Sequence, residues 1–282
     1  MYEHIKNNLF PQKLSYSRVS YQNIANINQH AILSNHQKIE VFSICFYIYI
    51  GLLIIINTIL ACILALVVPN EERREVLFQK IVAFCVAHVI SLNKGWQVDF
   101  KGTEKICPGE NYIIVVNHQS VIDPFLLFAL PIHFKLVAKE WVFKFPLIGL
   151  ILRLCNHILA EQGATLFACR KHLRSGTSVV IFPEGTRSSN GSILPFKKGA
   201  FLLSVMSGAC ILPIVIDGGR EVLPKYGRTL GQKALIKVHI LDPIDPSEFN
   251  CEVEQLGTYT QTVMRAYLND LNGTKLKVAS GS

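Results

Sequence analysis

The chain has 282 residues, of which 50% are hydrophobic and 17% are charged, and its formal net charge is +8. This length accommodates one sizeable domain with an appendage. A basic chain could bind nucleic acid, but the Lys and Arg residues are dispersed and lack interleaved stacking aromatic residues. We therefore expect no nucleic-acid partner, and we expect the positive charge to favour anionic membrane lipids.

Residues 1–40 are rich in Asn, Gln and Ser and have no periodic apolar face, which predicts a poorly ordered polar leader. Residues 41–68 contain no Lys, Arg, Asp or Glu. About 20 helical residues cross a bilayer core, so this run predicts an N-terminal transmembrane helix. The alternative, a buried core helix, is disfavoured because soluble domains usually interrupt such a run with charge.

The flanks of this run bear on its orientation. Arg73, Arg74 and Lys80 follow it, whereas Lys38 is the nearby positive residue before it. Positive residues favour the cytoplasmic side, so we expect a single-pass membrane protein with the rest of the chain in the cytosol. In the segment 69–95, the sequence predicts a helix over residues 71–92. We expect this helix to be too short to cross a membrane, and either to lie at the interface or to pack on the domain.

From residue 96 to 282, short apolar runs alternate with helical stretches. The predicted strands are 112–116, 134–138, 156–160, 178–182, 211–216 and 235–241. The predicted helices are 124–130, 164–174, 199–207 and 253–271. Several strands are apolar on both faces, which is typical of a sheet covered on both sides. The alternation predicts an α/β domain with a largely parallel sheet covered by helices.

The sequence NHQSVID occupies residues 117–123, directly after a predicted strand. His118 should then lie at the carboxyl end of the strand, where open α/β sheets bind ligands. Asp123 before Pro124 is a good helix N-cap. If the turn brings the two side chains together, the carboxylate can hold one ring nitrogen and leave the other as a base. The alternative is a structural histidine beside a simple helix cap.

The sequence FPEGTRS occupies residues 182–188, also after a predicted strand. Gly185 permits close backbone approach and Thr186 adds a hydroxyl. Arg187 supplies a planar fork suited to phosphate, and Glu184 could hold that fork or accept from a hydroxyl. Lys197 offers a second phosphate partner near a helix start. The alternatives are a surface turn with an incidental ion pair and a solvated basic turn.

These two motifs, followed by PFKKGAF and ILPIVI, resemble those of the glycerolipid acyltransferases, in particular the 1-acylglycerol-3-phosphate acyltransferases. The resemblance covers roughly residues 96–246 and implies that residues 96–282 form the catalytic domain. It implies that His118 is a general base and that Asp123 orients it. It implies that the acceptor's glycerol phosphate is bound by Glu184, Gly185, Thr186 and Arg187.

The resemblance further implies an acyl thioester donor, acyl-CoA or acyl carrier protein, and no cofactor or metal. Eight cysteines without CxxC spacing likewise predict no zinc site. Members of this family commonly have an arginine in an intermediate block, but this chain reads ILAEQGA over residues 158–164. Gln162 occupies that place, and Arg170 or Arg174 could substitute only from the following helix.

We therefore expect transfer of an acyl group to the sn-2 hydroxyl of lysophosphatidic acid, giving phosphatidic acid. We favour a bacterial inner membrane over the endoplasmic reticulum. One alternative is acylation of another lysolipid. A second is a membrane lipid hydrolase, which the absence of a GxSxG elbow disfavours. A third is a non-enzymatic membrane scaffold.

Overall fold

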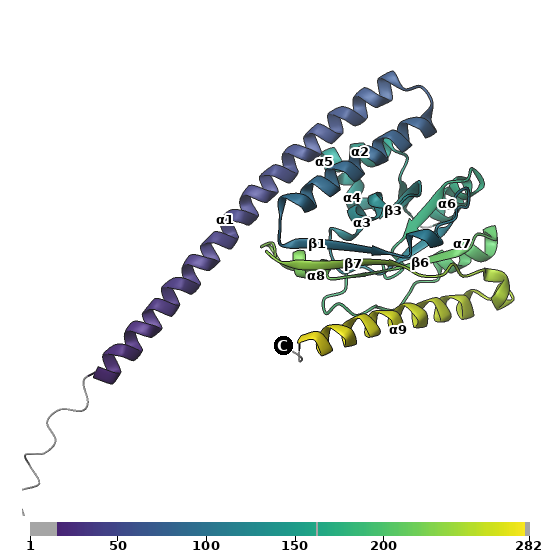
Figure 1. Cartoon of the computed structure of the whole chain (residues 1–282). Helices are drawn as coiled ribbons and strands as arrows, with labels where there is room; N and C mark the ends of the chain where they lie inside the picture. The colour runs from purple at the N-terminus through teal and green to yellow at the C-terminus, as the bar shows by residue number, and fades with distance from the viewer. Residues whose placement is uncertain (1–15, 162, 280–282) are drawn as a thin grey trace, which may run out of the picture.

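The computed structural model describes residues 16–161 and 163–279, with side chains described for 39–161 and 163–273. A seven-stranded sheet with the order β1-β7-β6-β2-β5-β3-β4 lies at its centre (Figure 1). The strands are β1 (Trp96–Lys101), β2 (Ile113–Val116), β3 (Phe134–Lys139), β4 (Ile158–Ala160), β5 (Ser178–Ile181), β6 (Ile211–Asp217) and β7 (Ala234–Ile240). Strands β2 to β6 run parallel, whereas β7 runs antiparallel to β6 and β1 runs parallel to β7. The expected α/β fold with a largely parallel sheet is confirmed.

Helices cover both faces of the sheet (Figure 1). One face carries α2 (Glu71–Leu92), α3 (Asp123–Leu126), α4 (Glu140–Lys144) and α5 (Pro146–Leu154). The other carries α6 (Ala164–Arg174), α7 (Gly199–Ser207) and α9 (Val253–Ala279). The short α8 (Gly219–Val222) follows β6, and 3-10 turns lie at Thr103–Lys105, Leu127–Ala129 and Pro246–Phe249.

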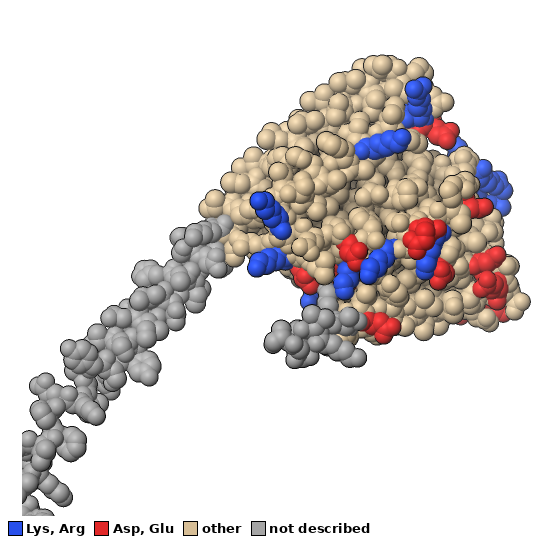
Figure 2. Space-filling model, in the orientation of Figure 1, with Lys and Arg blue, Asp and Glu red and all other residues tan. Residues whose placement is uncertain are grey.

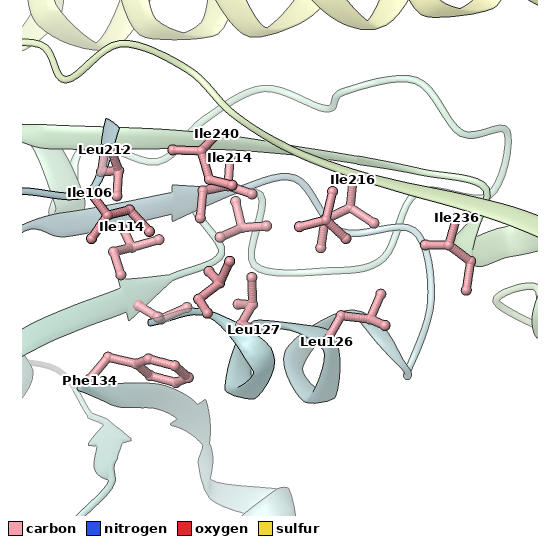
Figure 3. Close-up of a cluster of buried hydrophobic side chains, with 14 of the residues drawn as sticks. Ile106, Ile114, Leu126, Leu127, Phe134, Leu212, Ile214, Ile216, Ile236 and Ile240 are labelled. Carbon is pink, nitrogen blue, oxygen red and sulfur yellow. The ribbon is translucent and has the colours of Figure 1, made fainter. Parts of the chain in front are cut away.

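Strand β2 shows how the core is divided between the two faces. Ile114 and Val116 join the cluster under α3, where Leu126 and Leu127 pack on β2 and β6 (Figure 3). Ile113 and Val115 point the other way, into the cluster formed with α6, α7 and α9. Successive side chains of a strand alternate between faces, so an unbroken apolar run is needed where both faces are covered.

The N-terminal helix α1 (Tyr16–Val67) and α2 form a helical hairpin against the domain (Figure 1). Two helical segments are long and apolar enough to cross a membrane, Ile39–Val67 and Glu71–Leu92. The 22 residues of α2 span about 33 Å at 1.5 Å per residue, so the expectation that this helix is too short was wrong. Figure 2 shows that the surface over α1 and α2 is largely uncharged.

Residues 16–40 belong to α1, although their composition predicted a leader without regular structure; residues 1–15 lie outside the described part of the chain. Helix α1 contacts the domain near both ends of its apolar segment. Tyr47 Oη donates to Arg228 O at 2.9 Å, and further along the helix Ala61 packs with Phe78 and Cys155. The apolar segment therefore lies along the domain.

Strand β1 was not predicted from the sequence. Its sequence, WQVDFK, mixes apolar and charged residues, and its place at the edge of the sheet explains why. An edge strand has one neighbour and an exposed side, so it need not be uniformly apolar. Helices α4 and α5 were also missed, because they have only five and nine residues, which is short for recognition by periodicity.

Candidate active site

The two motifs lie side by side because β2 and β5 are parallel neighbours. Their carboxyl ends therefore meet at one edge of the sheet. The loops are joined directly, since Ser188 N donates to His118 O at 2.7 Å. His118 N in turn donates to Glu184 Oε1 at 2.8 Å. The expected meeting of the two motifs is thus found in the fold.

His118 and Asp123 form a hydrogen-bonded pair, with 2.9 Å between Nδ1 and Oδ2. The same carboxylate oxygen accepts from the backbone N–H groups of Gln119 and Ser120, each at 2.7 Å. Asp123 is fully buried, whereas the His118 side chain is 18% exposed. With Nδ1 held as a donor to the carboxylate, Nε2 is left as the proton-accepting nitrogen.

Asp123 does not cap α3 as we expected from the sequence. It is the first helical residue, Ile122 occupies the N-cap position, and the cap makes no side-chain hydrogen bond. The Asp123 carboxylate points back along the chain to the N–H groups that precede the helix. This arrangement closes the 117–123 turn and brings a carboxylate five residues away onto the imidazole.

Two residues that the sequence analysis did not single out hold His118 in place. The side-chain amide of Asn117 forms two hydrogen bonds with Ile216 of β6. Its Nδ2 donates to Ile216 O and its Oδ1 accepts from Ile216 N, at 2.8 Å each. This side chain ties the loop after β2 to the neighbouring strand. The Phe182 ring packs on the imidazole with 4.5 Å between ring centroids. Their places next to His118 and Glu184 within the motifs are the signal that could have identified them.

Glu184 lies between the two motif loops. It is buried, and its two oxygens accept from His118 N and from Leu194 N, the latter at 3.0 Å. The carboxylate therefore joins the two motif loops from inside, and its contact with the substrate stays a prediction from the sequence. Burial raises the pKa of the Glu184 carboxyl to about 7, although the backbone N–H groups of Leu194 and His118 lower it.

The cationic residues of the second motif lie on its outer side. Gly185 has φ +65°, and a Cβ there would lie 3.0 Å from Lys197 Nζ, so the lysine crosses directly over the glycine. Thr186 is exposed and Arg187 is half-buried. The structure thus brings Gly185 and Lys197 together, and within its described part it records no ion pair that would neutralise Arg187.

The family's intermediate arginine falls in this chain at the start of the segment that leads into α6. Gln162 lies outside the described residues. Arg170 and Arg174 belong to α6, which packs on the face of the sheet opposite α3. A different cation is close instead: Arg220 Nη1 donates to Ser189 O at 3.4 Å, beside the FPEGTRS loop. No sequence motif indicated Arg220, because only the path of α8 brings it there.

Two further histidines have internal partners. His157 Nδ1 accepts from Leu136 N at 3.0 Å, and burial lowers the pKa of His157 to about 3. His239 Nδ1 lies 3.0 Å from Tyr267 Oη. Within the described part of the chain, no three His, Cys, Asp or Glu side chains are arranged to hold a metal ion.

Comparison with known proteins assigns a family to this site. The Acyltransferase family model matches residues 97–217, the segment that contains both motifs. A human 1-acyl-sn-glycerol-3-phosphate acyltransferase alpha is 33% identical over 196 residues, covering 66% of this chain and 68% of the human protein. The chain belongs to the 1-acyl-sn-glycerol-3-phosphate acyltransferase family.

Other members of the family are also similar. A chloroplastic member from Arabidopsis thaliana is 30% identical over 166 residues, or 56% of this chain. That match is 47% of the Arabidopsis protein, so this chain spans about half the length of the chloroplastic relatives. A crystal structure of the 1-acyl-sn-glycerophosphate acyltransferase of Thermotoga maritima superposes with a TM-score of 0.73 and 26% identity, covering 82% of this chain and 94% of that one.

Proposed function

We propose that this protein transfers an acyl group from a thioester to the sn-2 hydroxyl of lysophosphatidic acid, forming phosphatidic acid at a membrane. The observation that carries the proposal is the 2.9 Å contact between His118 Nδ1 and the fully buried Asp123, at the sheet edge that also carries Arg187. A base beside a phosphate-binding cation suits an acceptor that has both a hydroxyl and a phosphate. The names of the relatives support the same acceptor.

The chemistry needs one proton shuttle and no cofactor. The neutral His118 Nε2 takes the proton of the acceptor hydroxyl as its oxygen attacks the thioester carbonyl carbon. The carbon–sulfur bond then breaks, and the imidazolium returns the proton to the departing thiolate. Asp123 stabilises the imidazolium between the two steps, and the N–H groups of Gln119 and Ser120 hold the carboxylate in register. The donor is acyl-CoA or acyl carrier protein.

Phosphate recognition is assigned to the cations on the outer side of the second loop. Arg187 offers a two-pronged contact, and Lys197 lies over Gly185, where its ammonium adds a point charge. Glu184 contributes indirectly, since it holds the loop that carries these cations against His118.

The apolar hairpin of α1 and α2 supplies the membrane attachment. A cytoplasmic catalytic domain is supported by Arg73 and Arg74 after the first apolar segment. A single crossing and a bacterial inner membrane stay predictions from the sequence. Ser43 and Tyr47 of α1 form hydrogen bonds with the catalytic domain. If α1 crossed the bilayer away from the domain, these hydrogen bonds would have to break.

Substitution of His118 tests the proposal. His118→Ala should abolish transfer from labelled acyl thioester to lysophosphatidic acid in membranes that contain equal amounts of protein. His172→Ala is the matched control, because this histidine lies on α6, on the far face of the sheet. Retained turnover in the His118 variant would refute the proposal.

Two alternative functions can each be distinguished from the proposed one by an assay. Another lysolipid could be the acceptor, because the intermediate arginine is replaced. Turnover measured on a panel of lysolipids with different head groups distinguishes such an acceptor from lysophosphatidic acid. A lipid hydrolase would consume thioester without any lysolipid. The hydroxyl of Ser120 is an unsuitable nucleophile for that reaction, since it donates to Leu223 O at 2.7 Å.

A further inference from the structure

Four large apolar side chains are exposed on α4 and α5, in a part of the molecule that neither motif explains. They are Trp141, 59% exposed, Phe145, 53% exposed, and Leu147 and Leu150, each 38% exposed. We call them the α4–α5 apolar surface. Single exposed apolar residues are common, but a cluster within ten consecutive residues indicates an interaction site.

Helix α5 has the largely apolar sequence PLIGLILRL. Its charged residue, Arg153, is exposed, and its guanidinium donates to Phe143 O at 2.9 Å and lies 5.9 Å from the Phe143 ring centre. The apolar face of such a helix belongs against protein or lipid. Because Leu147 and Leu150 remain exposed, the protein itself covers only part of this helix.

The covered side of α5 connects this surface to the apolar hairpin. Ile151 and Leu154 pack with Ala61 of α1 and Phe78 of α2. On the hairpin, Ile55, Ile59 and Ile63 of α1 and Phe84 of α2 are exposed among other large apolar residues. The α4–α5 apolar surface is therefore the continuation, on the catalytic domain, of the surface that attaches the protein to a membrane.

The residue types also suit a lipid headgroup region. Trp141 and Phe145 lie edge to face, with 6.1 Å between ring centroids. Lys144 lies between them in the sequence; its side chain is 70% exposed, and its ammonium lies 2.8 Å from Glu140 Oε1. Tryptophan and lysine beside aliphatic residues are characteristic of segments that lie at a membrane interface.

The location of this surface gives it a consequence for the active site. Helix α4 begins directly after β3, which is the parallel neighbour of β5, so it starts at the sheet edge that carries both motifs. Val121 and Phe125, on either side of Asp123 in the sequence, are likewise exposed at 43% and 44%. Contact with lipid along α4 and α5 would hold this edge at the level where a lysolipid presents its hydroxyl and phosphate.

We propose that the α4–α5 apolar surface is a second membrane-contacting site, which docks the catalytic domain into the headgroup region of an anionic phospholipid bilayer. Its expected occupant is lipid, and a second copy of this chain is the outcome that would contradict it.

Tryptophan fluorescence tests the contact without any assay of activity. The sequence has two tryptophans, Trp96 and Trp141. Trp96 is 7% exposed and donates to Gly231 O at 2.7 Å, so the difference between the wild type and Trp141→Phe isolates the signal of Trp141. In liposomes of phosphatidylcholine and phosphatidylglycerol, lipids brominated near the headgroup should quench Trp141 by about half relative to unbrominated lipids.

Equal Trp141 emission in both lipids, with continued quenching by aqueous iodide, would overturn the proposal. Crosslinking of Trp141→Cys between two protein copies, with no bromolipid quenching, would overturn it in favour of self-association.

A second measurement rests on the proposed acyl transfer. Trp141→Ser combined with Phe145→Ser should lower turnover of long-chain lysophosphatidic acid in vesicles by about tenfold relative to a short-chain, water-soluble analogue. Phe167→Ser is the matched control, because Phe167 is 78% exposed but lies on α6. An equal loss on both substrates would contradict the docking role. Absence of turnover in the wild type would contradict the proposed function instead, and would leave the quenching result to decide the membrane contact.

Discussion

Gly219 lies directly against the carboxylate of Asp123: a Cβ at position 219 would be 2.6 Å from Asp123 Oδ1 and 3.3 Å from Ser120 Cβ. Asp123 Oδ1 is buried and has no hydrogen-bond partner within the described part of the chain. The other oxygen, Oδ2, carries all three of its recorded hydrogen bonds. The first residue of α8 therefore limits where the carboxylate can lie, although it is far from the motif in the sequence.

Gly219→Ala should consequently act on catalysis through Asp123. The methyl group must displace the carboxylate by several tenths of an ångström, which misaligns the imidazole, and we expect kcat to fall about tenfold or more with little change in KM. Gly199→Ala is the control, because no atom lies within 4 Å of a Cβ at that position. Steady-state kinetics of the two variants provide the comparison, and equal kcat values would count against this role for Gly219.

Asp123→Asn separates the structural task of the carboxylate from its electrostatic one. The amide oxygen can still accept from Gln119 N and Ser120 N, so the turn should persist. The neutral amide no longer stabilises an imidazolium, and we expect kcat to fall about 10²- to 10⁴-fold. Thermal unfolding checks that the fold survives. A variant with nearly full kcat would remove Asp123 from the mechanism.

Glu184 predicts a pH dependence of stability. Its carboxyl ordinarily titrates near 4.5, and burial raises the pKa to about 7 in the folded protein. Between those values the folded state binds more protons than the unfolded state, so this group's stabilisation is present at pH 4.5 and is lost as the pH rises through 7. The loss is on the order of a few kcal/mol.

Melting temperatures of the wild type and Glu184→Gln, measured from pH 5 to pH 8, test this sign. We expect the wild type to lose stability over that range relative to the variant, which does not titrate at this position. Parallel curves would show that the Glu184 carboxyl does not titrate there.

Arg187→Ala should chiefly weaken binding of the acceptor. Loss of a charge-assisted hydrogen bond to phosphate predicts a KM for lysophosphatidic acid that is about ten- to a hundredfold higher. An acceptor without phosphate, such as a monoacylglycerol, should be unaffected. An unchanged KM for lysophosphatidic acid would exclude the phosphate contact.

The adjacent lysines provide a matched pair for the second cation. Lys197 lies over Gly185, whereas Lys198 forms an ion pair with Glu254 on α9. Lys197→Ala should raise the KM for lysophosphatidic acid several-fold, and Lys198→Ala should leave it near the wild-type value. Arg220→Ala, which removes the cation that contacts Ser189 O, should raise it about two- to tenfold. Equal effects of the two lysine substitutions would point to general surface charge.

Much of the fold could be predicted because its signals are local. The strand Ile113–Val116 is an apolar run between polar segments, and helices Ala164–Arg174 and Gly199–Ser207 begin and end where the sequence indicated. The helix over Val253–Ala279 was predicted to end earlier than it does. The apolar hairpin was recognised only in part, because its second helix was expected to be too short to cross a membrane.

The candidate site was predicted in its residues but not in its internal arrangement. His118 and Asp123 could be paired because they follow one strand within five positions. The Glu184 carboxylate accepts from two backbone N–H groups, a role that the sequence did not indicate. That outcome depends on the loop at Leu194 folding over the motif, which no local pattern indicates.

The sequence by itself determined the class of fold, the apolar N-terminal segment and the polar strand ends that carry the chemistry. Each of these depends on residues that are neighbours along the chain, so hydrophobic pattern and turn chemistry suffice to reveal them. Tertiary structure decided that Gly219 abuts Asp123, that Arg220 reaches the second loop, and that Trp141 stays exposed. Those relationships join segments brought together only when the parallel sheet aligns the ends of its strands, and that alignment depends on packing of the whole core.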